Sequence, residues 1–204
     1  MTSGASERMA EADEGSAAQL RVDPDWAALR EIIRAKSFSQ GTQRVLVSGA
    51  KSSFYFDMKK TMADGQGGLL IAKLLLKLLR RMPCDFVGGL EMGAVPIATS
   101  VMIASALDGR PIPYFWVRKK PKEHGTQALI EGPPPESLSG RTAVVVEDVT
   151  TTGESSLNAV AAVRALGGRV DTVVTVVDRL EGARDNMARQ GVALVSLFTA
   201  EDFR

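Results

Sequence analysis

The sequence predicts an α/β protein with a largely parallel β-sheet flanked by helices. Strand-like and helix-like segments alternate along most of the chain, which is typical of sheets built from strand–helix–strand units. Two of the strand-like segments, 142–148 and 169–179, are apolar without polar alternation. Strands of that kind have both faces covered, so we expect a doubly wound arrangement with helices on both sides of the sheet.

The individual elements follow from local patterns. A helix begins at Pro24 and runs to about residue 36, with Trp26 and Leu29 on its apolar face. Two short strands, 44–49 and 53–57, surround a glycine turn. We expect the later helices at 66–82, 94–107, 153–168 and 182–190, and the later strands at 85–91, 113–119, 142–148, 169–179 and 192–198.

The sequence also suggests how the chain is divided. Residues 1–20 are small and polar, and we expect them to form a disordered tail. Residues 21–204 are expected to form a single domain. Within it, the first helix and the hairpin, about residues 21–60, would form a small hood beside the sheet.

Composition and charge exclude several classes of protein. The chain has 204 residues and a formal net charge of +1, so no overall field attracts nucleic acid or a membrane surface. Its most apolar stretch, 69–82, is too short to span a bilayer and contains Lys73 and Lys77. Cys84 is the only cysteine, which excludes an intrachain disulfide and favours a reducing, cytoplasmic location. We therefore expect a small-molecule partner, with no nucleic acid and no membrane.

The stretch VVVEDVTTTGESS, residues 144–156, holds the strongest candidate site. An apolar strand ends in two adjacent carboxylates, at the edge where parallel sheets bind ligands. Small hydroxyl residues and a glycine then lead into a helix N-terminus, which favours a phosphate. A sugar phosphate meets both demands, whereas the alternative is an ordinary capped helix without a ligand. The candidate substrate-binding residues are Glu147, Asp148, Thr150, Thr151, Thr152, Gly153, Glu154 and Ser155.

A second candidate is the basic segment VRKKPKEHGTQALIEG, residues 117–132. Five potential cations stand within residues 118–124 beside a single acid, Glu123, and glycines at 125 and 132 would let the segment move. Such a segment suits a lid over a highly anionic leaving group, such as pyrophosphate. The alternative is a solvated surface. The five residues are Arg118, Lys119, Lys120, Lys122 and His124, and His124 is the only histidine of the chain.

The acidic strand end and its loop resemble the phosphoribosyl-diphosphate-binding motif of type I phosphoribosyltransferases. That family has a parallel sheet flanked by helices, with a small N-terminal hood. The basic segment resembles the mobile catalytic loop of orotate phosphoribosyltransferases, whose pattern is Arg-Lys-x-x-Lys-x-His-Gly. The resemblance implies that Arg118, Lys119, Lys122 and His124 contact the diphosphate. It also implies a homodimer with shared active sites, because the lysine matching Lys119 comes from the neighbouring subunit in that family.

Two further segments extend the resemblance. SGAKSSFYFD, residues 48–57, is similar to the family's Ser-Gly-x-x-Ser-x-Tyr-aromatic strand. This similarity implies that Tyr55 and Phe56 flank the flat pyrimidine ring, and the alternative is that these rings pack the hood. GLEMGAVPIA, residues 89–98, matches the loop in which a backbone turn approaches the diphosphate.

The acceptor base would be recognised at the end of a later strand. Arg179 matches the arginine that binds the orotate carboxylate, and Thr151 matches the threonine beside the same ring. Without the resemblance, Arg179 would more often form a surface ion pair with Glu181.

The sequence departs from the family pattern at particular positions. Some members carry a lysine where this chain has Val47, and some carry one where it has Gly93. Their contacts would be absent here, or supplied by Lys51 or by backbone N–H groups. The first acid of the pair is Glu147 rather than aspartate, and its longer side chain should still reach ribose hydroxyls.

The resemblance implies transfer of ribose 5-phosphate from phosphoribosyl diphosphate to N1 of orotate, giving orotidine 5′-monophosphate and pyrophosphate. Mg²⁺ would be the cofactor, held through the substrate, with Asp148 as the candidate protein ligand. The catalytic candidates are Lys119, Lys122, His124 and Asp148. Three alternatives stand beside this hypothesis: a phosphoribosyltransferase for another nucleobase, a regulatory protein that senses phosphoribosyl diphosphate and binds nucleic acid, and a structural domain.

Overall fold

The predicted α/β architecture is confirmed by a computed structural model, which describes residues 19–45, 51–120 and 129–204. Within these residues a six-stranded sheet has the order β5-β4-β3-β6-β7-β8, and β1 and β2 form a separate hairpin. Neighbouring strands of the sheet are parallel except β4 and β5. The strands are β3 (Phe86–Leu90), β4 (Tyr114–Val117), β5 (Ile130–Glu131), β6 (Ala143–Thr150), β7 (Thr172–Asp178) and β8 (Ala193–Thr199).

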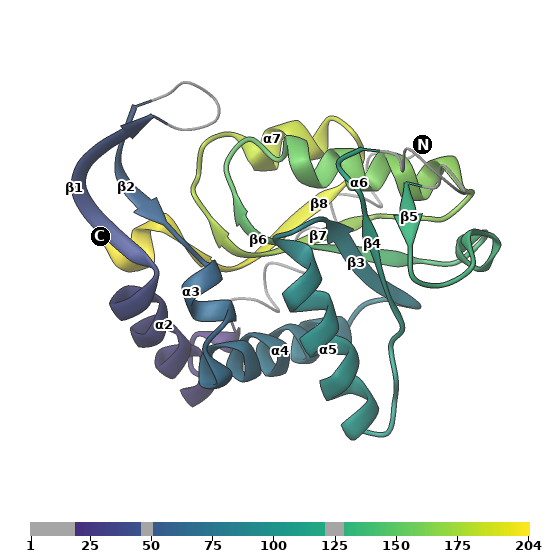
Figure 1. Cartoon of the computed structure of the whole chain (residues 1–204), viewed down its shortest axis with the longest axis horizontal. Helices are drawn as coiled ribbons and strands as arrows, with labels where there is room; N and C mark the ends of the chain where they lie inside the picture. The colour runs from purple at the N-terminus through teal and green to yellow at the C-terminus, as the bar shows by residue number, and fades with distance from the viewer. Residues whose placement is uncertain (1–18, 46–50, 121–128) are drawn as a thin grey trace.

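Helices cover both faces of the sheet, as Figure 1 shows. One face carries α2 (Pro24–Lys36), α4 (Gly65–Leu79) and α5 (Ala94–Leu107), and the other carries α6 (Glu154–Ala165) and α7 (Ala183–Ala188). The side chains of β6 divide between the two layers, since Val144 and Val146 join the first core cluster and Val145 joins the second. The prediction that this apolar strand is covered on both faces is therefore confirmed.

The N-terminal hairpin lies beside the carboxyl ends of β6 and β7 (Figure 1). It pairs β1 (Phe38–Val45) with β2 (Lys51–Phe56) antiparallel, with Phe38 opposite Phe56. The prediction that its first strand spans 44–49 was wrong, because the strand begins at Phe38. That residue lies in the polar run SFSQGTQ, and its ring packs 5.1 Å from Phe56 through a tertiary contact that the local pattern does not reveal. Residues 46–50 lie outside the described residues.

Short elements were also missed. The single-turn helix α3 (Lys59–Met62) follows the hairpin. The 3-10 helix η1 (Pro135–Leu138) lies between β5 and β6, and η2 (Ala200–Phe203) follows β8. These segments and β5 span four residues or fewer, so they present too little periodicity to be recognised in the sequence.

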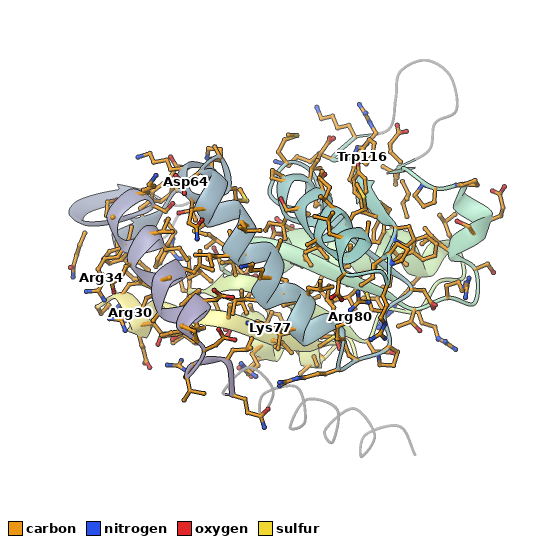
Figure 2. All side chains as sticks on the ribbon, turned by 90° about the horizontal axis from the view of Figure 1, so that it is seen from below. Arg30, Arg34, Asp64, Lys77, Arg80 and Trp116 are labelled. Carbon is orange, nitrogen blue, oxygen red and sulfur yellow. The ribbon has the colours of Figure 1, made fainter. Side chains whose placement is uncertain are left out.

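The helices α2 and α4 are tied together at both ends. The side chain of Asp64, which caps α4, lies 2.5 Å from Lys36 at the end of α2. At the other end, Lys77 of α4 lies 2.5 Å from Asp23, which caps α2. Figure 2 shows Asp64 and Lys77 toward opposite ends of α4. Exposed ion pairs contribute little to the free energy of unfolding. These two pairs mark where the ends of the antiparallel helices α2 and α4 meet.

In the described part of the chain, none of the helices combines the length and apolar character needed to cross a membrane.

We expect Phe203→Ala to destabilise the junction between the hairpin and the C-terminal segment. Phe203 is 3% exposed, and its ring lies 5.2 Å from Phe56, 5.6 Å from Phe198 and 5.8 Å from Phe38. Removing a buried phenylalanine ring costs about 3–5 kcal/mol of unfolding free energy. Urea unfolding should show this loss, whereas the exposed Val22→Ala should change stability by less than about 0.5 kcal/mol. Equal losses in both variants would contradict the packing argument.

Candidate functional site

A cavity of about 730 Å³ lies at the carboxyl ends of β6 and β7, beside the hairpin. This is the edge of a parallel sheet where ligands bind, because loops from several strands meet there. Most of the predicted site residues converge on it from segments far apart in the sequence. Those that line it are Tyr55, Phe56, Lys119, Glu147, Asp148, Thr150, Thr151, Thr152, Gly153, Glu154, Ser155 and Arg179.

A second cavity of about 570 Å³ adjoins the first. Its walls include the turn between β3 and α5, Leu90–Gly93, and Pro96 of α5. The two cavities share Lys59, Lys119, Glu147, Asp148, Val149 and Ser155, so they form one groove with the acid pair in the middle.

The acid pair is only partly accessible to solvent. Glu147 is 7% exposed, and the buried hydroxyl of Ser156 donates to its Oε2 at 3.3 Å. Asp148 is half-buried, and its Oδ1 accepts from the backbone N–H of Val149 at 2.9 Å. Burial, reinforced by the negative charge of Asp148, raises the pKa of Glu147 to about 8. Glu147 therefore holds its proton at neutral pH in the ligand-free protein.

Gly93 leaves room for these carboxylates. A Cβ at this position would lie 2.6 Å from Asp148 Oδ1 and 2.8 Å from Glu147 Oε1. Any larger side chain would therefore displace the acid pair. This close approach gives a physical reason why the lysine of some relatives is absent at position 93.

The loop after β6 has the geometry expected of an anion site. Gly153 takes a left-handed conformation, φ +84°, and caps the N-terminus of α6. The loop is held from outside by α7, where the Asn186 side-chain amide donates to the Thr152 carbonyl at 2.8 Å. Within the loop, Thr150 is 2% exposed, and its Oγ1 has no hydrogen-bond partner among the described residues. A buried hydroxyl without a partner is costly, so a ligand in this cavity would gain a ready hydrogen-bonding group.

Arg179 is buried rather than on the surface, contrary to the surface alternative. Its residue exposure is 4%, although the predicted partner, Glu181, does bind it through Nη2 at 2.8 Å and Nε at 3.0 Å. Its guanidinium also stacks on the ring of Phe54, with 4.6 Å from Cζ to the ring centroid. A buried, laterally supported guanidinium at a cavity wall suits recognition of a carboxylate.

The two predicted aromatic residues differ in their surroundings. Tyr55 is half-buried at the cavity wall. Phe56 is 5% exposed, and its ring packs against those of Phe38 and Phe54 at 5.1 and 5.9 Å. Tyr55 is thus available to a ligand, whereas much of the Phe56 ring serves the hairpin core, as the alternative anticipated.

The basic segment begins on a fixed stem beside the groove. The Arg118 N–H donates to the Leu129 carbonyl at 2.8 Å, and the Lys119 N–H donates to Glu91 Oε1 at 3.0 Å. Lys119 lines both cavities, but Arg118 lines neither and points its Nη1 to within 3.8 Å of Glu131. Exposed Lys120 also lines neither cavity. The predictions for Lys122 and His124 lie outside the described residues, as does the side chain of Lys51.

The sequence reasoning missed several residues of the groove. Lys59 lines both cavities, Ser156 supports Glu147, and Asn186 and Glu91 hold the loops on either side. Only Lys59 carried a usable signal, since it is a cation three residues after the end of the aromatic strand. Ser156 lies within the stretch 144–156, nine residues after Glu147, but its contact depends on how the loop folds back. Glu91 and Asn186 act through contacts between distant segments, which the local pattern does not contain.

The donor set can be compared with what Mg²⁺ requires. In the segments that the structure describes, no cluster of three or more His, Cys, Asp and Glu side chains could hold a metal ion. The groove instead offers the pair Glu147 and Asp148. One or two carboxylates fit Mg²⁺ when substrate oxygens and water complete its octahedral shell.

We expect Glu147→Gln to flatten the pH dependence of stability. In the folded protein this carboxyl has its pKa raised to about 8, whereas its ordinary value is 4.5. Between these values the folded state binds more protons, so the free energy of unfolding of the wild type falls as pH rises. Urea unfolding between pH 5 and 8 should show a weaker decline in the variant. Glu136→Gln, at an exposed position, is the control. If the free energy of unfolding of Glu147→Gln falls with pH as steeply as that of the wild type, the raised pKa of Glu147 is refuted.

Comparisons with known proteins agree with this geometry. Residues 64–192 match the family described as phosphoribosyl transferase domain. The chain is 50% identical over 178 residues to an orotate phosphoribosyltransferase of Bradyrhizobium diazoefficiens, covering 87% of this chain and 95% of that one. Two structures of the Mycobacterium tuberculosis orotate phosphoribosyltransferase are also similar, one of them in complex with 5-phospho-alpha-D-ribosyl 1-diphosphate.

The two structural matches extend over nearly the whole of the related protein. The first has a TM-score of 0.76 and 39% identity, covering 88% of this chain and 99% of that one. The complex with the diphosphate has a TM-score of 0.73 and 37% identity over the same shares. Since the family model spans more than half of the chain and the relatives are similar over almost their full length, the chain belongs to the orotate phosphoribosyltransferase family.

Proposed function

We propose that this protein transfers ribose 5-phosphate from phosphoribosyl diphosphate to orotate, releasing pyrophosphate. The observation that carries the proposal is the single groove in which an acid pair lies between a phosphate-type loop, a buried arginine and lysine side chains. In the reaction, the bond from the anomeric carbon to the diphosphate oxygen breaks, a bond from that carbon to N1 of orotate forms, and the proton of N1 passes to the departing pyrophosphate.

The groove supports a definite placement of the donor. The 5′-phosphate fits the 151–155 loop, which leads into the N-terminus of α6, where backbone N–H groups without helical partners favour an anion. The ribose hydroxyls fit the carboxylates of Glu147 and Asp148. The pyrophosphoryl group then extends into the second cavity, toward Lys119 and the turn at Gly93. Mg²⁺ bound through the substrate would supply positive charge beside Asp148.

The acceptor fits the opposite end of the groove. We assign the orotate carboxylate to Arg179, whose guanidinium is already oriented by Glu181 and Phe54. Tyr55 and Thr151 line the same cavity and would contact the ring. The negative charge of orotate is on its carboxylate, which Arg179 would bind, and the basic pyrophosphate leaving group can accept the N1 proton. The site therefore has to orient the ring and stabilise the developing charges.

The chemical step would develop positive charge on the ribose as the anomeric carbon loses the pyrophosphate. The negative charge of one carboxylate of the acid pair stabilises an oxocarbenium-like transition state, and cations stabilise the departing pyrophosphate. We assign these roles to Asp148 and Lys119. The roles of Lys122 and His124 remain predictions.

A homodimer with shared active sites is part of the proposal. Exposed apolar side chains lie on α5 and in the turn before it: Met92 is 67% exposed, Ile103 51% and Leu107 86%. A second copy of the chain would cover them. Sharing of the active sites through Lys119 stays a prediction, because Lys119 lines the groove of its own chain. A cytoplasmic location also remains a prediction, based on the lone Cys84.

Loss of orotate absorbance in the presence of phosphoribosyl diphosphate and Mg²⁺ tests the proposal directly. Wild-type turnover is expected, and Lys119→Ala should lower kcat by about 10²–10³-fold if Lys119 acts like one oxyanion-hole donor. Asp148→Asn should also lower turnover, while Lys73→Ala, on the exposed face of α4, should not.

Failure of the wild type with orotate would refute the assignment. Turnover with another base would then identify the other nucleobase alternative. Salt-sensitive nucleic-acid binding without turnover would identify the regulatory alternative.

Gly93→Ala should impair activity without unfolding the protein. The added methyl group would press against both carboxylates of the acid pair and displace them. A misplacement of about 1 Å at a reacting centre costs roughly 10²-fold in rate. Gly65→Ala is the matched control, because a Cβ there meets nothing within 4 Å. Equal kcat/KM values for the two variants would show that position 93 tolerates a side chain.

A further inference from the structure

We infer that Lys59 is a substrate-contacting residue, which presents its ammonium group to the pyrophosphoryl oxygens of phosphoribosyl diphosphate. The inference rests on the proposed function and adds a residue that the motifs of the sequence did not indicate. Lys59 lines both cavities, together with Lys119 and the acid pair. Among the described residues that line the second cavity, the positively charged ones are Lys59 and Lys119.

The backbone at Lys59 is held firmly in place. Lys59 is the first residue of α3, between Met58 and Thr61, which are 1% and 0% exposed. The Thr61 hydroxyl lies 2.6 Å from the Ser37 hydroxyl, and the Thr61 N–H donates to the same Ser37 oxygen at 3.2 Å. These buried contacts hold the backbone at Lys59, so the side chain begins at the groove.

The side chain itself is free to exchange partners. Its Nζ lies 2.9 Å from Asp57 Oδ1, and 76% of the side chain is exposed. An exposed pair of this kind is weak, so a multiply charged phosphate can compete with Asp57 for the ammonium. Asp57, and to a smaller extent Asp148, raises the pKa of Lys59, so the cation is present at the pH of the reaction.

The opposite wall supplies no cation at position 93. Gly93 stands there without a side chain, and a Cβ added to it would lie 2.6 Å from Asp148 Oδ1 and 2.8 Å from Glu147 Oε1. The negative charge of a bound diphosphate must be offset by cations close to it. The net charge of the chain is only +1, so the protein as a whole provides no attractive field for an anion. Lys59, from the hood side of the groove, meets this need beside Lys119.

Lys59→Gln and Lys60→Gln form a matched pair that tests the inference. Lys60 is adjacent, exposed and outside both cavities, and its substitution removes the same charge. We expect Lys59→Gln to raise the KM for phosphoribosyl diphosphate and to weaken binding of inorganic pyrophosphate with Mg²⁺, each by about tenfold, as for loss of one charge-assisted hydrogen bond. The KM for orotate should change less than about twofold, the resolution expected of such a measurement. Lys59→Arg should restore most of the affinity, and Lys60→Gln should match the wild type.

Calorimetry with pyrophosphate separates this inference from the proposed function. If the wild type turns over orotate and Lys59→Gln binds pyrophosphate as Lys60→Gln does, the role of Lys59 is overturned and the function stands. If the wild type does not turn over orotate but only Lys59→Gln loses pyrophosphate affinity, the function is overturned and the role of Lys59 in binding stands. A wild type that does not bind pyrophosphate would overturn the inference.

Discussion

The arrangement of the site depends on one electrostatic constraint, which is the placement of two adjacent carboxylates at the end of a strand covered on both faces. β6 is apolar up to Val146, and of the two acids that follow, Glu147 is buried and Asp148 is half-buried. Burial therefore makes a second negative charge costly, and the pKa of Glu147 rises accordingly. Two neighbouring residues accommodate the pair. Ser156 donates a hydrogen bond to Glu147, and Gly93 has no side chain to occupy the space beside the carboxylates.

The parallel topology explains how distant segments reach these carboxylates. β3, β4, β6 and β7 all end at the same edge, so the turns that follow them are neighbours although they are far apart in the sequence. The turn after β3 brings Gly93, the end of β4 brings Lys119, and the turn after β7 brings Arg179. Tertiary hydrogen bonds then fix these turns, from Lys119 to Glu91 and from Asn186 to Thr152. The sheet thus brings the functional residues close together, and these hydrogen bonds orient the loops that carry them.

The sequence predicted the layers of the fold well, because long apolar runs and helical periodicity are local signals. Helix 94–107 was placed with the observed bounds, and the acid pair and the loop after it were placed at the correct edge. Elements that depend on tertiary packing were misplaced. The polar run around Ser39 and Gln40 hid a strand that Phe38 anchors by its ring contacts. In the site, the ion pair of Arg179 with Glu181 could be read from the sequence, but its burial could not, since Phe54 comes from a distant strand that only the fold brings against the guanidinium.

The distribution of charge reconciles a nearly neutral chain with a highly anionic substrate. A net charge of +1 gives no long-range attraction, so the favourable interactions must be short-range and must differ along the groove. Cations come from three separate elements, with Lys59 on α3, Lys119 after β4 and Arg179 after β7, while the carboxylates stay together on β6. A ligand with negative ends and a hydroxyl-bearing centre matches this alternation, whereas a uniformly anionic ligand would place charge against Glu147 and Asp148. The acid pair therefore selects as well as binds, because it penalises any anion that cannot present hydroxyl groups or a bound cation to it.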